Sequence, residues 1–469
     1  MREAKDVVLE TDLYRAVFTE EGGAIKAFYL KKYHESVEKD SPLVNVVNSI
    51  PPLYPLASGT MGRRGGIGGF VPIYMKAHRG EGAISFTATL QGGAVLKKVY
   101  TLSKDSYWVD LTISLEGPKN GPVPGLLLAN KPILESTSYS FQGISLLGVD
   151  GYTEITLKEG ETEKYSGKLT WIGIGDKYFM ATLVPLSKWV NGWDIAMKKV
   201  NGDGLVSVFI RPNIVDGILT SRPLKLGVFI GPKEIDTLKA VDHELVQTIN
   251  FGWFDIVAKP LLYFLKFIYR FTHNYGIAII ILTILIKIAF WPLAHKSAKA
   301  MKTMQKIQPK LQKLKEKYGD DKERLNKELL QIYKTYKVNP MSGCLPMLLQ
   351  IPVFFALYKV LLQAIELRHA PFMLWINDLS APDRLMIPGV DIPMVHGIPV
   401  LTILMGVSMW WQQKMTPASL DPTQAKMMQF LPVIFTFMFV TFPSGLVLYW
   451  LVNNVLSVAQ QYYINKFTD

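Results

Sequence analysis

Residues 275–293 read YGIAIIILTILIKIAFWPL, an apolar run in which Lys287 is the only charged side chain. Because a helix of about 20 mainly apolar residues crosses the hydrocarbon core of a bilayer, this run predicts a membrane-spanning helix. Similar runs recur toward the C-terminus. We therefore predict five spans, at residues 275–294, 345–367, 398–415, 427–442 and 445–462. Ahead of them, residues 236–274 mix apolar and charged residues in a way that predicts connecting and interfacial amphipathic helices.

The composition of the whole chain agrees with a membrane protein. Of its 469 residues, 49% are apolar and only 19% are charged, whereas soluble domains carry about 25% charged residues. One cysteine cannot close an intramolecular disulfide, and the seven histidines are scattered without an HxH or HExxH pattern. This pattern disfavours a metalloenzyme, and we expect no metal site.

Positive charge is concentrated in one block. Residues 295–341 hold thirteen Lys/Arg and five Asp/Glu, which places +8 of the net charge of +12 there. Basic loops remain in the cytoplasm, so residues 368–397 and the N-terminal region are expected outside and the C-terminus inside. An exported N-terminal domain needs a signal, and none precedes Glu3. We therefore expect that an N-terminal signal anchor, which would be a sixth span, is missing from this chain.

The basic block has the apolar spacing of two packed helices. Gly319 suits the end of the first helix, and Asp320 with Glu323 suits a capping box at the start of the second. Pro309 is expected to break the chain before this hairpin or to start its first helix. Charge alone leaves anionic lipid, ribosomal RNA and a nascent chain open as partners. The 4-3-4 seams are Ile307, Leu311, Leu314 and Tyr318, and Leu325, Leu329, Ile332 and Tyr336.

Residues 1–235 have a different pattern. Short runs of alternating apolar and polar residues, such as 84–90 and 107–113, are separated by clusters of Gly, Pro and Asn. This pattern predicts a mostly antiparallel β-sandwich. A helical pattern over residues 234–250 then connects it to the apolar half.

Lys287 requires an explanation, because a lysine at the centre of a spanning helix costs about 2.5–3.5 kcal/mol on insertion scales. It either lines a hydrated cavity or extends past Pro292 to the headgroups, and the sequence leaves both open. Thr283, one turn earlier, shares its face. Each polar residue alone is commonly a helix–helix contact, but together they suggest a hydrated, mildly positive groove. Those in or near the other predicted spans are Gln350, Ser408, Gln412, Asn453 and Asn454.

An ordered set of motifs resembles the YidC family of membrane protein insertases, the Oxa-type insertases. The motifs are QPK at 308–310, GDDK at 319–322, KVNP at 337–340, QIPVF at 350–354, LWINDLS at 374–380 and FPSGL at 442–446. The resemblance is dense over residues 250–465 and looser before them. It implies a bacterial inner-membrane protein with a periplasmic β-supersandwich, five core helices and a cytoplasmic hairpin. It also implies that hydrophobic segments are guided from the cytoplasm into the bilayer without nucleotide, so we expect no cofactor and no enzymatic activity.

The resemblance further implies roles for individual residues. The positive residue of the family's groove, usually Arg, falls on Lys287. The expected groove residues are Lys287, Thr283, Gln350, Ile351, Phe354, Ser408, Gln412, Met438 and Trp450, of which Ile351, Phe354, Met438 and Trp450 fall on the family's substrate contacts. The resemblance also implies that the hairpin captures substrates early. The residues expected to do so are Lys310, Lys313, Lys317, Asp320, Asp321 and Lys322. The implied partners are nascent membrane proteins, the Sec translocon, anionic lipids and the ribosome, the last only weakly because no long basic tail precedes Asp469.

Two other function classes compete with this interpretation. A polytopic transporter or channel with an exported glycan-binding domain would fit the composition, but transporters tend to show internal repeats and we find no convincing repeat among the predicted spans. A sugar-processing enzyme in residues 1–235 would need paired acid and base groups. His34 and His78 are the only histidines there, and neither adjoins a suggestive carboxylate motif.

Overall fold

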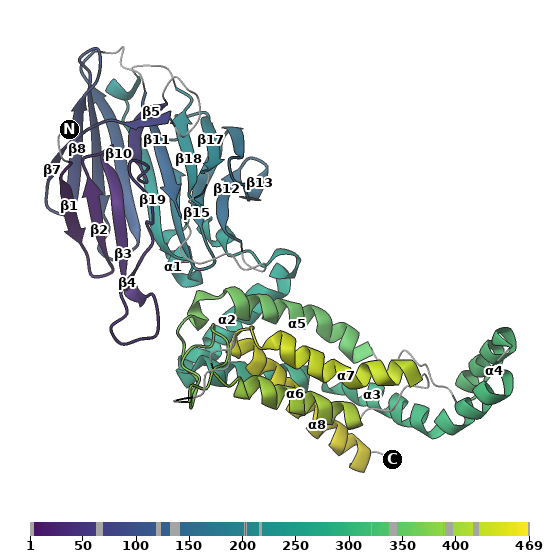
Figure 1. Ribbon diagram of the computed structural model, residues 1–469. Coiled ribbons are helices and arrows are strands. Elements are labelled where there is room, and N and C mark those ends of the chain that lie inside the picture. Colours follow the sequence, from purple (N-terminus) through teal and green to yellow (C-terminus); the bar gives the residue numbers. More distant parts are fainter. Residues whose placement is uncertain are drawn as a thin grey trace. The chain divides into compact units, whose positions relative to one another are not determined.

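The chain forms two compact units, Met1–Asn250 and Phe251–Asp469. The computed structural model describes residues 4–61, 69–118, 123–131, 141–200, 202, 204–214, 218–319, 321–336, 345–387, 389, 397–415 and 422–467 (Figure 1). The first unit includes α1 (Ile235–Val241) and η3 (Leu245–Thr248). The helical pattern over residues 234–250 is therefore two short helices, because positive φ angles at Asp242, His243 and Glu244 turn the chain between them.

The strands of the first unit form antiparallel sheets, which confirms the predicted β-sandwich class. One sheet has the order β1 (Asp6–Glu10), β2 (Tyr14–Thr19), β3 (Ala24–His34), β4 (Leu43–Asn45). A long sheet has the order β13 (Gly151–Ile155), β12 (Gly143–Gly148), β15 (Leu169–Gly175), β16 (Phe179–Pro185), β19 (Leu224–Pro232), β10 (Trp108–Glu116), β9 (Val95–Leu102), β8 (Ala83–Thr89), β7 (Lys76–Arg79). A third has the order β14 (Thr162–Gly167), β17 (Trp193–Lys199), β18 (Val206–Pro212), β11 (Gly125–Asn130), β5 (Ala57–Met61), β6 (Phe70–Pro72), and η2 (Ile218–Thr220) precedes β19.

Alternation explains why these segments become strands. In β10, Val109, Leu111 and Ile113 are buried while Asp110 between them is exposed. Side chains alternate between the two faces of a strand, so the apolar set lies on one face. Pairing with β9 and β19 keeps that face in register with theirs.

A buried lysine links the sheets of the first unit. Lys98 on β9 is fully buried, and its Nζ donates hydrogen bonds to the carbonyl oxygens of Gly22 (3.0 Å), Gly23 (2.8 Å) and Leu56 (2.5 Å). Gly22 and Gly23 form the turn between β2 and β3, where both have positive φ, and Leu56 directly precedes β5. One amino group thus joins elements of all three sheets. Burial lowers the pKa of Lys98, whereas an ammonium has the three donors that these carbonyls require.

The second unit is helical. Its elements are η4 (Gly252–Phe254), α2 (Asp255–Thr272), α3 (Tyr275–Tyr318), α4 (Lys322–Thr335), α5 (Leu345–Gln363), η6 (Ile365–Leu367), α6 (Val400–Met415), α7 (Pro422–Phe439) and α8 (Ser444–Phe467). Helices therefore occupy all five of the positions predicted as spans. α8 packs against α3, α5 and α6, and α7 packs against α6 (Figure 1).

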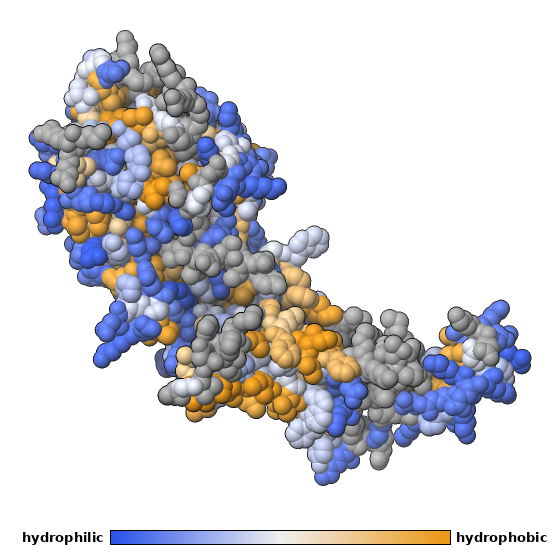
Figure 2. All heavy atoms as spheres, viewed as in Figure 1, coloured by the Kyte–Doolittle hydropathy of each residue, from blue (hydrophilic) through white to orange (hydrophobic). Residues whose placement is uncertain are grey.

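Outside the hairpin, the exterior of the helical unit is largely apolar. Within the part of the chain that the structure describes, α3 contains one stretch, Tyr275–Met304, that is long and apolar enough to cross a membrane. Shorter apolar stretches lie in α5 and α7, so the number of spans stays a prediction. Large apolar side chains such as Ile288, Val407 and Phe437 are more than half exposed, and Figure 2 shows apolar surface over the helical bundle and polar surface over α4. Soluble monomers rarely expose a large continuous apolar patch. The apolar surface of the helical bundle therefore favours a lipid environment.

The predicted hairpin is present, but two details of the prediction are wrong. α3 continues unbroken through Pro292 and Pro309, so Pro309 neither breaks the chain nor starts a helix. At Pro309, packing of Ile307 and Leu311 against α4 accounts for the continuity, because tertiary contacts override the local cost of a proline. The cap of α4 is Asp321, whose carboxylate accepts from the Arg324 amide at 3.0 Å. Asp320, the predicted cap, lies outside the described residues.

The seam of the hairpin agrees with the sequence pattern. Ile307 and Leu311 are buried against a cluster that includes Leu329 and Ile332 of α4. These residues come from the two 4-3-4 series, which confirms that the series face each other. At the far end of the series, Tyr336 is exposed.

Candidate functional site: a polar layer in the helical unit

Lys287 faces the interior of the helical unit. It is half-buried on α3, and its Nζ donates a hydrogen bond to the Ser457 hydroxyl of α8 at 2.7 Å. The Ser457 hydroxyl donates in turn to the Asn453 carbonyl oxygen at 2.7 Å. This hydrogen bond directs the Lys287 amino group toward α8.

Two further polar contacts join α8 to its neighbours. The Gln350 side chain of α5 donates to the Asn453 side chain at 2.8 Å. The Asn454 side chain donates to the Ser408 hydroxyl of α6 at 3.1 Å. We call the resulting set the polar layer, and it consists of Lys287, Gln350, Ser408, Asn453, Asn454 and Ser457.

Ser457 is the member of the polar layer that sequence reasoning missed. It lies one helical turn after Asn453, on the same face of α8, and that spacing was the available signal. Its contact with Lys287 joins residues 170 positions apart. Such a pairing depends on how α3 and α8 pack, which periodicity in uniformly apolar helices does not fix.

Some of the predicted groove residues lie elsewhere. Thr283 is buried, and its hydroxyl donates to the Ile279 carbonyl of its own helix at 2.6 Å. Gln412 is half-buried one turn beyond Ser408 on α6. Ile351 and Met438 are 41% and 47% exposed, so they lie at the surface of the helices and outside the polar layer.

Phe354 and Trp450 form the centre of an aromatic cluster, together with Phe435 and Phe439. The rings of Phe354 and Trp450 meet edge to face with centroids 4.7 Å apart. Trp450 also contacts Phe439 at 5.0 Å and Phe435 at 5.8 Å. The cluster joins α5, α7 and α8. Phe354 follows Gln350 by one turn, and Trp450 precedes Asn453 by about one turn, so the aromatic cluster adjoins the polar layer.

The hairpin residues are largely exposed. Lys310 donates to the Tyr336 hydroxyl and lies over its ring. Lys317 and Arg324 both lie 5.0 Å from the centroid of the Tyr318 ring, and Lys313 is exposed. Asp320 and the side chain of Lys322 lie outside the described residues. Among the residues that are described, no group of three or more His, Cys, Asp or Glu side chains is placed to hold a metal ion.

Comparisons with known proteins agree with this architecture. The family model "YidC periplasmic domain" matches residues 6–264, and "60Kd inner membrane protein" matches residues 267–469. The membrane protein insertase YidC of Syntrophobacter fumaroxidans is 42% identical over 98% of this chain and 86% of its own length. That of Pelobacter propionicus is 44% identical over 99% of this chain and 87% of its own length. A crystal structure of an active YidC insertase covers 100% of this chain and 94% of its own at 20% identity, and its TM-score of 0.43 is too low to support an inference.

The antiparallel β unit, the apolar helical unit and the two family matches define a bacterial inner-membrane protein with a periplasmic domain. More specifically, the chain belongs to the YidC family of membrane protein insertases. The resemblance seen in the sequence motifs is thereby confirmed.

Proposed function

We propose that this chain guides hydrophobic segments of newly made proteins from the cytoplasm into the bilayer through a groove formed at the polar layer. The observation that carries the proposal is the Lys287–Ser457 hydrogen bond inside an apolar helical unit. A cation held at such a depth is costly, and it is best explained if it meets a substrate. Membership of a family whose relatives are named membrane protein insertases supports the same function.

The proposed mechanism uses the chemistry of two neighbouring regions. Polar or acidic flanks of a substrate enter the polar layer and so avoid bare hydrocarbon, where an uncompensated polar group is expensive. Lys287 attracts acidic flanks most strongly, because attraction between charges is greater away from bulk water. The apolar segment then moves along the aromatic cluster around Phe354 and Trp450 into lipid. Burial of its apolar surface supplies the driving force.

The polar layer lies nearer to one end of the helices than to the other. This position supports access of a substrate from one side of the membrane. Lys287 is 12 residues after the start of α3, about 18 Å along the helix. Ser457 is 13 residues after the start of α8, about 20 Å along it. Across a hydrocarbon core of about 30 Å, both lie beyond the midplane, toward the hairpin. We propose five spans, with the β unit periplasmic and the hairpin and C-terminus cytoplasmic.

The hairpin is proposed to capture substrates before they reach the polar layer. Lys310, Lys313 and Lys317 are exposed on α3 and recur at intervals of three or four residues, so they share one face of the helix. This basic face suits anionic lipid headgroups and the acidic flanks of nascent chains. Cooperation with the Sec translocon, and a weak contact with the ribosome, belong to the same proposal through the family.

Replacing Lys287 tests the proposal. Lys287→Ala should reduce insertion of single-span substrates with acidic N-tails about tenfold, which corresponds to about 1.4 kcal/mol. Lys287→Arg should retain insertion, because it keeps the charge. Insertion is measured by protease protection of the tail in cells depleted of the native protein.

Two controls accompany this experiment. Substrates with neutral tails should be less affected, because they gain little from the charge. Lys359→Ala is the matched variant, since it removes a lysine of α5 that is outside the polar layer. Normal insertion of acidic-tailed substrates by Lys287→Ala would overturn the role of the charge.

A further inference from the structure

The hydroxyl of Ser457 has a fixed orientation on α8. It donates its proton to the Asn453 carbonyl oxygen one turn earlier, at 2.7 Å, a contact that serines in helices commonly make. A hydroxyl has a single proton to donate and accepts through the lone pairs of its oxygen. Because the proton is directed at Asn453, the lone pairs are available to the Lys287 amino group, which lies 2.7 Å away. Ser457 is therefore a preset acceptor for Lys287.

Lys287 needs such an acceptor because its side chain is flexible. An ammonium is a compact charge on a four-carbon stem with rotatable donors, and a lysine stem can extend along apolar surface until the charge reaches water. The neighbouring side chains of Ile284 and Ile288 on α3 are exposed, and hydrocarbon offers the ammonium nothing to bind. Without a fixed acceptor, the amino group would be expected to leave α8 and extend toward the headgroups.

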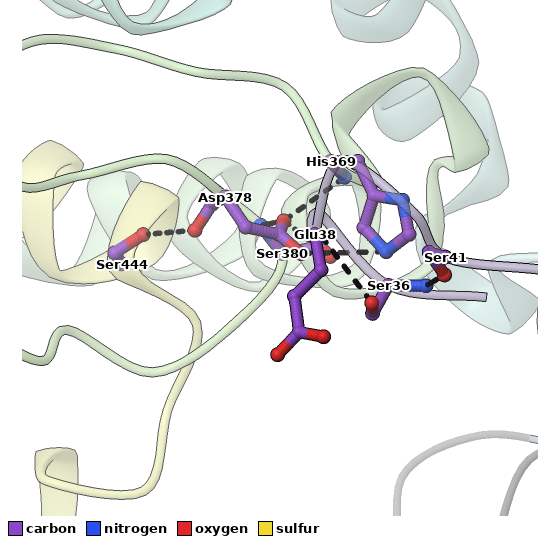
Figure 3. Close-up of polar contacts among 7 residues, drawn as sticks. All are labelled: Ser36, Glu38, Ser41, His369, Asp378, Ser380 and Ser444. Carbon is purple, nitrogen blue, oxygen red and sulfur yellow. Dashed lines mark hydrogen bonds and ion pairs between the residues drawn. The ribbon is translucent and has the colours of Figure 1, made fainter. Parts of the chain in front are cut away.

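The attachment of α8 to the helical unit does not depend on Ser457. At the start of α8, the hydroxyl of Ser444 donates to the backbone carbonyl of Asp378 at 2.8 Å (Figure 3). Further along, the side chain of Asn453 accepts from α5 at 2.8 Å, and that of Asn454 donates to α6 at 3.1 Å. The Ser457 hydroxyl is thus an additional contact, directed at the cation on α3.

We propose that Ser457 is a positioning residue, which holds the Lys287 amino group against α8, where it meets the acidic flank of a substrate. The inference rests on the proposed function in one respect, that an acidic flank is what Lys287 attracts. An ammonium has three donors. Ser457 takes one of them, and a substrate carboxylate binds through another. Ser457 therefore acts through Lys287.

The proposal predicts a selective loss of insertion in Ser457→Ala. Substrates with acidic N-tails should insert about fivefold less well, as expected for the loss of one hydrogen bond. Substrates with neutral tails should insert normally, because the effect passes through the charge. Ser457→Thr keeps the hydroxyl and should retain insertion of both. Protease protection of the tail gives the readout, and a merely structural role would impair both classes of substrate equally.

A thermodynamic cycle tests the contact without using insertion. Ser457→Ala is made in the wild-type chain and in Lys287→Met, and each full chain is unfolded in detergent by titration with SDS. Loss of helical circular dichroism reports the equilibrium. With Lys287 present, Ser457→Ala should raise the unfolding equilibrium constant about tenfold, because a hydrogen bond to a charged group is lost. In Lys287→Met it should be nearly neutral, and the difference between backgrounds is the coupling.

Thr436→Val is the matched control for this cycle. The Thr436 hydroxyl on α7 donates to the Pro432 carbonyl oxygen of its own helix at 2.7 Å, as Ser457 does to Asn453. Thr436→Val should show no coupling to Lys287→Met. Should Ser457→Ala not accumulate, Ser457→Cys keeps the size of the side chain and replaces the hydroxyl by a weaker acceptor. Its effects on coupling and insertion should be intermediate.

The positioning role and the proposed function fail separately. A cycle without coupling in folded variants would overturn the role of Ser457, whatever the insertion activity of Lys287→Ala. Coupling without a selective loss of acidic-tailed substrates in Ser457→Ala would overturn it as well, if Lys287→Ala does lose them. Coupling combined with normal insertion by Lys287→Ala would retain Ser457 as the residue that holds the amino group and would overturn the proposed function of the charge.

Discussion

At the scale of single residues, the protein buries ionisable groups by supplying hydrogen bonds from fixed positions. Lys287 donates to a hydroxyl on a neighbouring helix, and Asp383 accepts from an indole and from the amides at a helix start. Glu20, just before the Gly22–Gly23 turn, is also buried. Its carboxylate accepts from the Tyr74 hydroxyl and, at 3.2 Å each, from the amides of Lys5 and Ala77.

The surroundings of Glu20 predict an acid-sensitive contribution to stability. Burial raises the pKa of Glu20, but the hydrogen bonds from Tyr74, Ala77 and Lys5 outweigh burial and leave the pKa lowered. The stabilisation is therefore complete above the pKa of the unfolded chain, about 4.3, and is lost as the pH falls through the lowered folded value. Glu20→Gln should destabilise the first unit at pH 7, and its difference from wild type should shrink below about pH 4.

The measurement is urea unfolding of the full chain in detergent at a series of pH values. Unfolding of residues 1–250 is followed by their susceptibility to a protease that is active in acid. Glu81→Gln, an exposed residue of the same unit, is the control. A difference between Glu20→Gln and wild type that stays constant with pH would contradict the prediction.

At the scale of elements, patterns in the sequence predicted the type of each unit but not the contacts between elements. Alternation predicted the sheets, and apolar runs predicted the positions of α3, α5, α6, α7 and α8. The prediction at Pro309 was wrong because proline breaks an isolated helix, whereas packing against α4 supports α3 at this point. Asp383 was counted only as a charge of an external segment, because its role as a cap depends on a helix start 18 residues away.

The contact between sheets at Lys98 has a measurable consequence. Lys98→Met keeps the length of the side chain but removes one donor from each of three carbonyls. Those of Gly22 and Gly23 still accept from the Ser58 amide and the Tyr100 hydroxyl, so the loss falls mainly on the carbonyl of Leu56. A buried carbonyl that loses its partner is costly, so the first unit should lose about 2 kcal/mol of stability. The loss is measured from urea unfolding of the full chain at pH 7.

Lys97→Met is the control for this variant. Lys97 neighbours Lys98 on β9, and its side chain is 42% exposed and pairs with Glu116 at the surface. Surface ion pairs contribute little, so this change should be nearly neutral. Equal effects of the two variants would show that the buried amino group does not join the sheets.

At the scale of the whole molecule, each unit has the exterior its environment requires. The β unit is mainly polar outside, whereas the helical unit exposes large apolar side chains and keeps the members of the polar layer buried or half-buried. The resemblance to the YidC family came from short motifs, and the assignment of Lys287 to the groove came through it. Residues alone had left Lys287 open between a cavity and the headgroups. Its contact with Ser457 could not be predicted, because it depends on how α3 packs against α8.

Site-specific photocrosslinking tests the proposed route of the substrate most directly. A photoreactive residue is placed at Phe354 or Trp450, next to the polar layer, or at Val407, which is 54% exposed on α6. Each variant is presented with a ribosome-stalled single-span nascent chain. We predict strong crosslinks from Phe354 and Trp450 and few from Val407. Crosslinks from Phe354 and Trp450 that do not exceed those from Val407 would contradict a groove that guides substrates past Lys287.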